Sequence, residues 1–237
     1  MLSRDELSTF VGIDLGGGKG KNTAVALLER CDDGVCVRFV GRRFPEPTNE
    51  HTPARTARNA PFYDDELLGY LRGLPKSTLL AIDAPLTRTA CTRCVLPSCP
   101  GLGDCPDPAT RWMLDKGGRL ISQKISTSAK PLVTPYTQRA CEVLMHRRYG
   151  IMPRETLGQG MGPLTARAHY LVRALETRFP LDKTLIEVYP KATLHELCGA
   201  DVAASYKRTA STWRVRAQIL ESLGERLHFD VWREGCL

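Results

Sequence analysis

The chain has 237 residues, 42% of them hydrophobic, and a formal net charge of +7 at pH 7. A chain of this length can bury one sizeable core, so we expect a single domain over residues 1–237. No stretch approaches the roughly 20 apolar residues that cross a bilayer, and the first ten residues lack the apolar core of a signal peptide. These observations argue against a membrane protein and predict a soluble, cytoplasmic one.

Nine cysteines are an odd number, and four of them crowd into one short loop. This distribution suits a disulfide framework poorly and favours a reducing compartment. The charge is also uneven, because the segment 111–183 holds 13 Lys plus Arg against 5 Asp plus Glu. A phosphate-binding surface and a solvated helical surface both explain this excess of positive charge.

The first predicted element is a short apolar strand over 10–15 that carries Asp14 and runs into the glycine-rich turn 16–20. Two further strands are predicted over 23–28 and 35–40. The polar turn Asp32-Asp-Gly34 between them suits a hairpin, so three antiparallel strands are expected to open the fold.

A polar, proline-punctuated loop is expected over 45–61, followed by a helix that Asp64 caps and that runs to about Gly73. A buried strand over 78–83 then ends in Asp83. Residues from 86 to about 135 are rich in Cys, Pro, Gly, Ser and Thr, which predicts an elaborate insertion without regular elements.

Helical sequence resumes near Tyr136, and apolar residues at i, i+4, i+7, i+8 and i+11 from Leu164 predict one face of a helix. The remaining predicted elements are a strand over 184–189 that carries Glu187 and helices over 192–197 and about 211–226. The fold class predicted from this order is α/β, with a mixed five-stranded sheet, flanking helices and a Cys-rich insertion.

Three acidic residues, Asp14, Asp83 and Glu187, lie in or at the ends of separate apolar strands, where an unpaired charge is costly. Carboxylates from several strand ends can converge and bind Mg²⁺ or Mn²⁺ through oxygen. Taken singly, Asp14 and Asp83 have an alternative role in organising turns, and Glu187 one in pairing with a basic residue. Taken together, the three predict a metal site that hydrolyses phosphodiesters by a two-metal mechanism.

Short motifs in the same order add a resemblance to a family. These are VGIDLG at 11–16, AIDAP at 81–85, GQGMG at 158–162 with ARAH at 166–169, and IEVYP at 186–190. The chain resembles the domain of unknown function 429 family, predicted nucleases with a ribonuclease H-like fold, from residue 10 to about 197. The resemblance implies that Asp14, Asp83 and Glu187 form the acidic cluster of a nuclease.

Ribonuclease H-like enzymes usually supply another carboxylate from a C-terminal helix. In this sequence only Glu225, Asp230 and Glu234 are near the expected place. Either one of them substitutes, or the site uses three carboxylates, or catalysis is impaired.

Cys91, Cys94, Cys99 and Cys105 follow the pattern C-x2-C-x4-C-x5-C. Four thiolates so close together can satisfy tetrahedral Zn²⁺ and would fix an insertion too small for a core of its own. An iron–sulfur cluster is the rival interpretation, although the spacing matches neither standard pattern, and unbound thiols are the third.

Basic residues predict the substrate contacts. They are Lys19 and Lys21 in the first glycine turn, and Arg139, Arg167 and His169 in the basic middle segment. A tight hairpin is the alternative role of the glycine turn, and a solvated or hydrogen-bonded histidine is the alternative for His169. Tyr206-Lys-Arg208 and Trp213-Arg-Val-Arg216 interleave aromatic and basic side chains in a way that suits stacking on single-stranded nucleic acid, or that reflects core contacts.

The leading hypothesis is therefore a metal-dependent nuclease that binds DNA or RNA. One alternative is a phosphotransferase of the actin and sugar-kinase superfamily, which shares the three opening strands and a glycine turn after an aspartate. The other is a noncatalytic nucleic-acid-binding module stabilised by zinc.

Overall fold

The computed structural model describes most of the chain. The described residues are 6–17, 23–32, 34–43, 61–117, 133–151, 155–158, 160–207, 212–225 and 227. No helix among them is long and apolar enough to cross a membrane.

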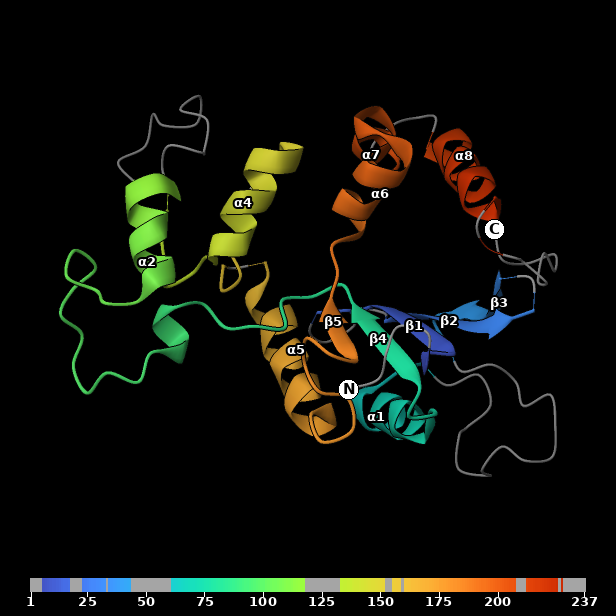
Figure 1. Ribbon diagram of the computed structural model, residues 1–237, viewed down its shortest axis with the longest axis horizontal. Helices are drawn as coiled ribbons and strands as arrows, with labels where there is room; N and C mark the ends of the chain where they lie inside the picture. Colours follow the sequence, from blue (N-terminus) through green and yellow to red (C-terminus); the bar gives the residue numbers. More distant parts are fainter. Residues whose placement is uncertain are drawn as a thin grey trace. The chain divides into compact units, whose positions relative to one another are not determined.

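A mixed five-stranded sheet forms the centre of the α/β fold (Figure 1). Its strands are β1 (Thr9–Asp14), β2 (Ala24–Cys31), β3 (Gly34–Gly41), β4 (Thr78–Ile82) and β5 (Leu185–Glu187), in the order β3-β2-β1-β4-β5. The first three are antiparallel neighbours, whereas β4 pairs parallel with both β1 and β5. The five predicted strands and their mixed arrangement are confirmed.

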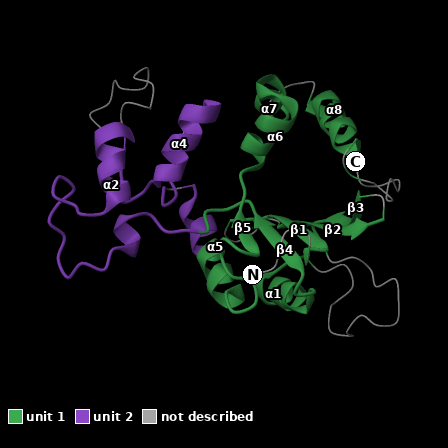
Figure 2. Cartoon of the chain, in the orientation of Figure 1, with its two compact units in different colours: residues 1–86, 167–237 green, residues 87–166 purple. Residues whose placement is uncertain are grey.

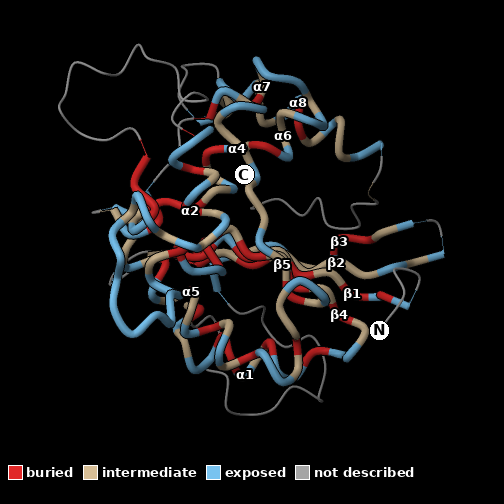
Figure 3. The backbone as a smooth tube through the Cα atoms, turned by 60° about the vertical axis from the view of Figure 1, so that its left-hand side comes forward, coloured by how far each residue is buried: buried red, intermediate tan, exposed pale blue. Residues whose placement is uncertain are grey.

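One face of the sheet forms the core. Alternate residues of the central strands, among them Val11, Ile13, Leu80 and Ile82, are almost completely buried, as the two-residue period of a strand requires. The helices α1 (Asp64–Gly73) and α5 (Gly162–Leu175) lie on one side of the sheet (Figures 1 and 3). They contribute buried residues to this core, which are Leu67, Leu68 and Leu71 of α1 and Ala168, Leu171 and Leu175 of α5.

Five further helices and two short turns complete the described part of the chain. They are α2 (Pro108–Trp112), α4 (Ala140–Tyr149), α6 (Pro190–Cys198), α7 (Ala200–Ser205) and α8 (Thr212–Gly224), with a 3-10 turn η2 (Cys91–Arg93) and a π-helical turn η3 (Met113–Gly117). The helices predicted near 64–73, 164–175, 192–197 and 211–226 are confirmed. Gly199, with φ of 91°, separates α6 from α7, which the sequence did not predict.

The chain divides into two compact units (Figure 2). Unit 1 comprises Met1–Leu86 and Arg167–Leu237 and contains the sheet, whereas unit 2 comprises Thr87–Ala166. Unit 2 begins where the insertion was predicted to begin but extends beyond residue 135 and includes α4. That the chain folds as one domain stays a prediction.

The prediction that the insertion lacks regular elements is wrong in its described part, because α2 and η3 lie there. The Asp107 carboxylate accepts the Thr110 N–H at 2.8 Å and caps α2, and Pro108 occupies the first helical position. The signal for a helix start was therefore present, but the surrounding Cys, Pro and Gly residues obscured it.

Cys31 and Cys36 form a disulfide across the turn of the β2–β3 hairpin, with their Cα atoms 6.1 Å apart. The expectation of reduced cysteines throughout is thus not met at this hairpin. Cys91, Cys94, Cys99, Cys105 and Cys198 are free.

The buried face of the sheet allows a test of the fold. Replacing Leu80, which is fully buried on β4, by Ala should lower the free energy of unfolding by about 2–5 kcal/mol, since it leaves a cavity. Val40→Ala on β3, where the side chain is 58% exposed, should change it by less than about 0.5 kcal/mol. Urea unfolding followed by circular dichroism measures both. Equal losses in the two variants would contradict this assignment of the core.

Candidate active site

Asp14 and Asp83 lie at adjacent strand ends in unit 1. β1 and β4 pair in parallel with Ile13 opposite Ile82, and the Asp83 N–H donates to the Ile13 carbonyl at 2.9 Å. Each aspartate directly follows one of these buried isoleucines, so alternation sends both carboxylates to the opposite face of the sheet. Asp14 is exposed and Asp83 is half-buried. The structure therefore brings these two predicted site residues together.

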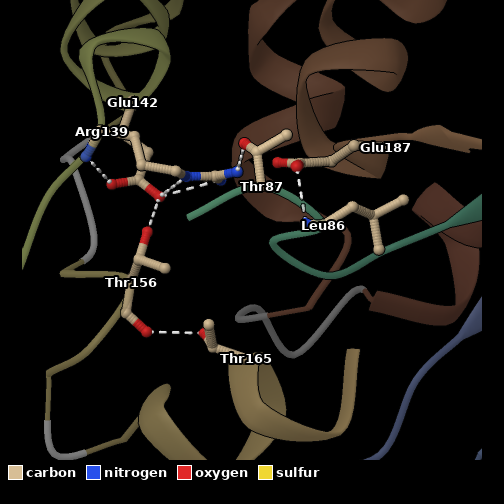
Figure 4. Close-up of polar contacts among 7 residues, drawn as sticks. All are labelled: Leu86, Thr87, Arg139, Glu142, Thr156, Thr165 and Glu187. Atoms are coloured by element: carbon tan, nitrogen blue, oxygen red, sulfur yellow. Dashed lines mark hydrogen bonds and ion pairs between the residues drawn. The ribbon is translucent and has the colours of Figure 1, made fainter. Parts of the chain in front are cut away.

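Glu187 lies at the end of the neighbouring strand β5, and its register differs from that of the aspartates by one residue. Its Cα partner is Ile82, not Asp83, so the pleat directs Glu187 to the face of Ile82. The Glu187 Oε2 accepts the Leu86 N–H at 2.8 Å (Figure 4). This hydrogen bond stabilises the turn that leaves β4 directly after Asp83. The sequence had suggested a basic partner for Glu187, and the hydrogen bond with Leu86 shows that the carboxylate also serves a backbone amide.

The three carboxylates thus lie at the carboxyl ends of neighbouring strands, but Glu187 does not lie on the same face of the sheet as the two aspartates. Across the described ranges of the chain, no three His, Cys, Asp or Glu side chains are arranged to hold a metal ion. Carboxylate oxygens suit Mg²⁺ or Mn²⁺ chemically, and Asp14 and Asp83 are the two members of the predicted set that lie at paired strand ends and face the same side of the sheet.

Arg167 on α5 holds the chain that follows β1. Its Nε donates to Asp64 Oδ1 at 2.6 Å, and one terminal nitrogen donates to the Gly16 carbonyl at 2.6 Å and to Thr23 Oγ1 at 2.7 Å. The same Thr23 oxygen accepts the Gly16 N–H at 3.2 Å. The other terminal nitrogen donates to the Phe62 carbonyl at 3.4 Å. Arg167, predicted as a substrate contact, directs these donors to protein acceptors and fixes the turn two residues beyond Asp14.

Asp64 was expected to cap α1, but Tyr63 is the N-cap residue and Asp64 is the first residue of the helix. Its carboxylate pairs with Arg167. The sequence contained no signal for this pair, because the two residues are 103 positions apart.

Arg139 belongs to a network of polar contacts in unit 2 (Figure 4). Its guanidinium contacts Glu142 Oε1 at 3.0–3.1 Å and donates to Thr87 Oγ1 at 2.9 Å. The Thr156 hydroxyl donates to the same Glu142 oxygen, and the Thr165 hydroxyl donates to the Thr156 carbonyl at 2.6 Å. The Arg139 side chain is only 7% exposed, so this predicted substrate contact lies inside unit 2, where it joins the start of α4 to other segments.

Three predicted substrate contacts and the candidates for a fourth carboxylate remain to be placed. His169 is half-buried on α5. Lys19 and Lys21 lie outside the described residues, as do Asp230 and Glu234 among the candidates for a fourth carboxylate. Glu225 is exposed just after α8.

The thiols of Cys91, Cys94, Cys99 and Cys105 lie in unit 2 and are free. Burial raises the pKa of the Cys91 thiol, and negative charge on Cys105, Cys99, Cys94 and Asp107 raises it further, in that order. Charge on the other three sulfur atoms therefore acts on Cys91, although the thiols are not arranged around a metal ion.

A basic and aromatic patch occupies the adjoining ends of α7 and α8. Its members are Tyr206, Lys207, Trp213, Arg214 and Arg216. The Arg216 guanidinium lies 5.1 Å from the centre of the Trp213 ring, and the Lys207 amine lies 5.1 Å from that of Tyr206. The Arg216 Nε also donates to the Tyr206 carbonyl at 3.2 Å, which joins the two pairs. Trp213 is 63% exposed, so this ring is a surface group and not a core contact.

In comparisons with known proteins, no family model, no curated protein and no solved structure matches the chain. The resemblance to the domain of unknown function 429 family therefore stays a prediction that depends on short motifs.

Substitution of Arg167 separates a structural role from a substrate contact. Arg167→Lys keeps the charge but loses the planar set of donors, so we expect unfolding free energy to fall by about 1–3 kcal/mol. Arg173→Lys, at an exposed position of the same helix, is the matched control and should be neutral. Thermal and urea unfolding measure both variants. Unchanged stability of Arg167→Lys together with weaker binding of nucleic acid would instead favour the substrate contact.

Proposed function

We propose that the protein is a metal-dependent nuclease that hydrolyses phosphodiester bonds at Asp14 and Asp83. The observation that carries the proposal is the parallel pairing of β1 with β4, which sets the two aspartates at adjacent strand ends on one face of the sheet. Strand ends of an α/β sheet are where ligands commonly bind. The Asp14 side chain is exposed, so it does not pack in the core.

The fold supports the same proposal at a coarser level. A mixed five-stranded sheet of order β3-β2-β1-β4-β5 with flanking helices is compatible with a ribonuclease H-like fold. The resemblance to the predicted nucleases of the domain of unknown function 429 family points to the same chemistry. Both are arguments by association, so the assignment of function depends on the aspartates themselves.

The carboxylates take different roles in this proposal. Asp14 and Asp83 are the residues that would hold Mg²⁺ or Mn²⁺. Such ions, when bound, neutralise phosphate charge and lower the pKa of a bound water. Glu187 belongs to the predicted metal set too, but we assign it first to positioning, because its carboxylate accepts the N–H of Leu86 three residues after Asp83.

Nucleic acid is the substrate that the exposed surface of unit 1 favours. The basic and aromatic patch on α7 and α8 offers the exposed Trp213 ring for stacking on a base. The exposed Lys207 and Arg214 place positive charge beside it for the phosphates. Together these groups fit a single strand, whose bases are accessible, better than a duplex.

A second candidate is a noncatalytic nucleic-acid-binding module. It is favoured by the finding that no three potential ligands converge within the described residues. It predicts binding without cleavage. For the phosphotransferase alternative, the glycine turn with Lys19 and Lys21 would carry the phosphate contacts, and these residues lie outside the described ones.

Isosteric substitution of the carboxylates tests the nuclease proposal. Asp14→Asn and Asp83→Asn should each reduce cleavage of labelled single-stranded DNA or RNA in Mg²⁺ or Mn²⁺ by more than about 100-fold, since loss of a direct ligand should exceed the 10–100-fold effect of an indirect one. Glu187→Gln should have a smaller effect, of about 10-fold or more, through the turn.

Glu176→Gln, at an exposed position after α5, is the matched control and should cleave normally. Full activity of Asp14→Asn would contradict the proposal. Binding without cleavage by the unsubstituted protein in either metal would support the noncatalytic module.

The patch on α7 and α8 gives a separate prediction about binding. Trp213→Ala should weaken binding of a labelled single strand by about 1–3 kcal/mol, the contribution of one stacked base. Arg214→Gln should reduce the slope of log K against log salt by about 0.7, since one phosphate contact is lost. Fluorescence anisotropy at several salt concentrations measures both effects.

Tyr170→Ala is the control for the loss of an exposed aromatic side chain, because Tyr170 on α5 is 45% exposed outside this patch. An equal loss of affinity in Trp213→Ala and Tyr170→Ala would show that the patch has no special part in binding.

A further inference from the structure

The cysteine loop of unit 2 has no core of its own. From Cys91 to Ala109 no residue is buried, and Val95 is 94% exposed. The pale blue trace in Figure 3 shows this exposure between the β4 end and α2. A segment that buries so little apolar surface needs another source of stability, such as a bound metal ion.

The two ends of the loop are nevertheless held together by polar contacts. Arg93, in η2, pairs with the Asp107 carboxylate at 3.3 Å. The Arg111 Nε donates to the Cys105 carbonyl at 3.1 Å. These contacts hold Cys105, at the far end of the loop, near the η2 segment that carries Cys91 and Cys94.

The turn η2 also sets two of the thiols close along the chain. Cys91 begins η2 and Cys94 follows it, with the Cys94 N–H donating to the Cys91 carbonyl at 3.4 Å. Cys99 lies within the loop that the Arg93–Asp107 pair closes. All four thiols are free, and Cys94 and Cys99 are exposed, so solutes can reach them.

We propose that Cys91, Cys94, Cys99 and Cys105 bind one Zn²⁺ ion, which fixes the loop of unit 2. Four thiolates satisfy tetrahedral zinc completely and leave no position open for substrate, so the site is structural. In the described chain, no three of these thiols are arranged to hold a metal ion. Zinc binding therefore requires the exposed loop to rearrange until the four sulfur atoms share one centre. The site is independent of the nuclease proposal, since it uses none of its residues.

Metal content and cobalt substitution of the full chain test the site. The protein purified without chelator should hold about one zinc ion per chain, because a four-thiolate site binds one ion. Elemental mass spectrometry measures this content. The double variant Cys94→Ser/Cys99→Ser should hold close to none. Cys141→Ser/Cys198→Ser, which removes two cysteines outside the loop, is the matched control and should keep the ion.

Because the double variant could fail to fold, the unsubstituted protein is also stripped of metal and titrated with Co²⁺. Tetrahedral thiolate ligation should produce intense visible absorption bands that saturate at one ion and disappear on addition of Zn²⁺. Alkylation should then modify Cys141 but spare the four loop cysteines in the zinc-loaded protein.

Three results would overturn the proposal. They are iron with sulfide in the purified protein, Co²⁺ spectra without thiolate bands, and equal alkylation of the loop cysteines with and without zinc. None of them depends on whether the protein cleaves nucleic acid.

Discussion

The parallel pairing of β1 with β4 is the constraint on which the rest of unit 1 depends. It aligns Ile13 with Ile82 in the core. The same register places Asp14 beside Asp83 at the carboxyl ends of the two strands. A shift of β4 by one residue would move Ile82 to the half-exposed face and Asp83 towards the core. The burial of the two isoleucines therefore stabilises the arrangement of the two carboxylates that we propose to be catalytic.

The contacts of Arg167 and Glu187 show how the surroundings of these aspartates are fixed. Arg167 connects α5 to the chain after β1 and to the first turn of α1, and the Glu187 carboxylate holds the turn after β4. Each uses a charged group to satisfy backbone or hydroxyl groups near a strand end. Such charge-assisted hydrogen bonds are stronger than neutral ones and can keep an exposed edge in one conformation.

Unit 2 is stabilised by different means. The Arg139–Glu142 pair, with its threonine contacts, is largely buried and joins segments far apart in sequence. The cysteine loop of the same unit has exposed residues instead of a core, and its ends are held by the Arg93–Asp107 pair. A metal ion at the four cysteines would supply the cross-link that hydrophobic burial does not.

The sequence by itself determined the strands of unit 1, most of its helices and the positions of the acidic residues along them, but it did not predict α7. Short apolar runs bounded by turn residues predicted the five strands, and the spacing from Leu164 to Leu175 predicted α5, because these patterns are local properties of the sequence. The same patterns placed Asp14 and Asp83 at strand ends. The short helix α2 was missed although Asp107 and Pro108 mark its start, since composition dominated the interpretation of that segment.

Only the tertiary structure decided which of these residues meet. Strand register separates Glu187 from the two aspartates by one position, and register depends on pairing between segments about 100 residues apart. The partners of Arg167 were equally invisible, because a basic residue in a helix can face solvent, substrate or a distant carboxylate with the same local sequence. The same holds for the contact of Arg139 with Thr87, although its other partner, Glu142, is only three residues away. Local patterns therefore sufficed for the strands and the longer helices of this fold, whereas the geometry of its candidate site required long-range packing.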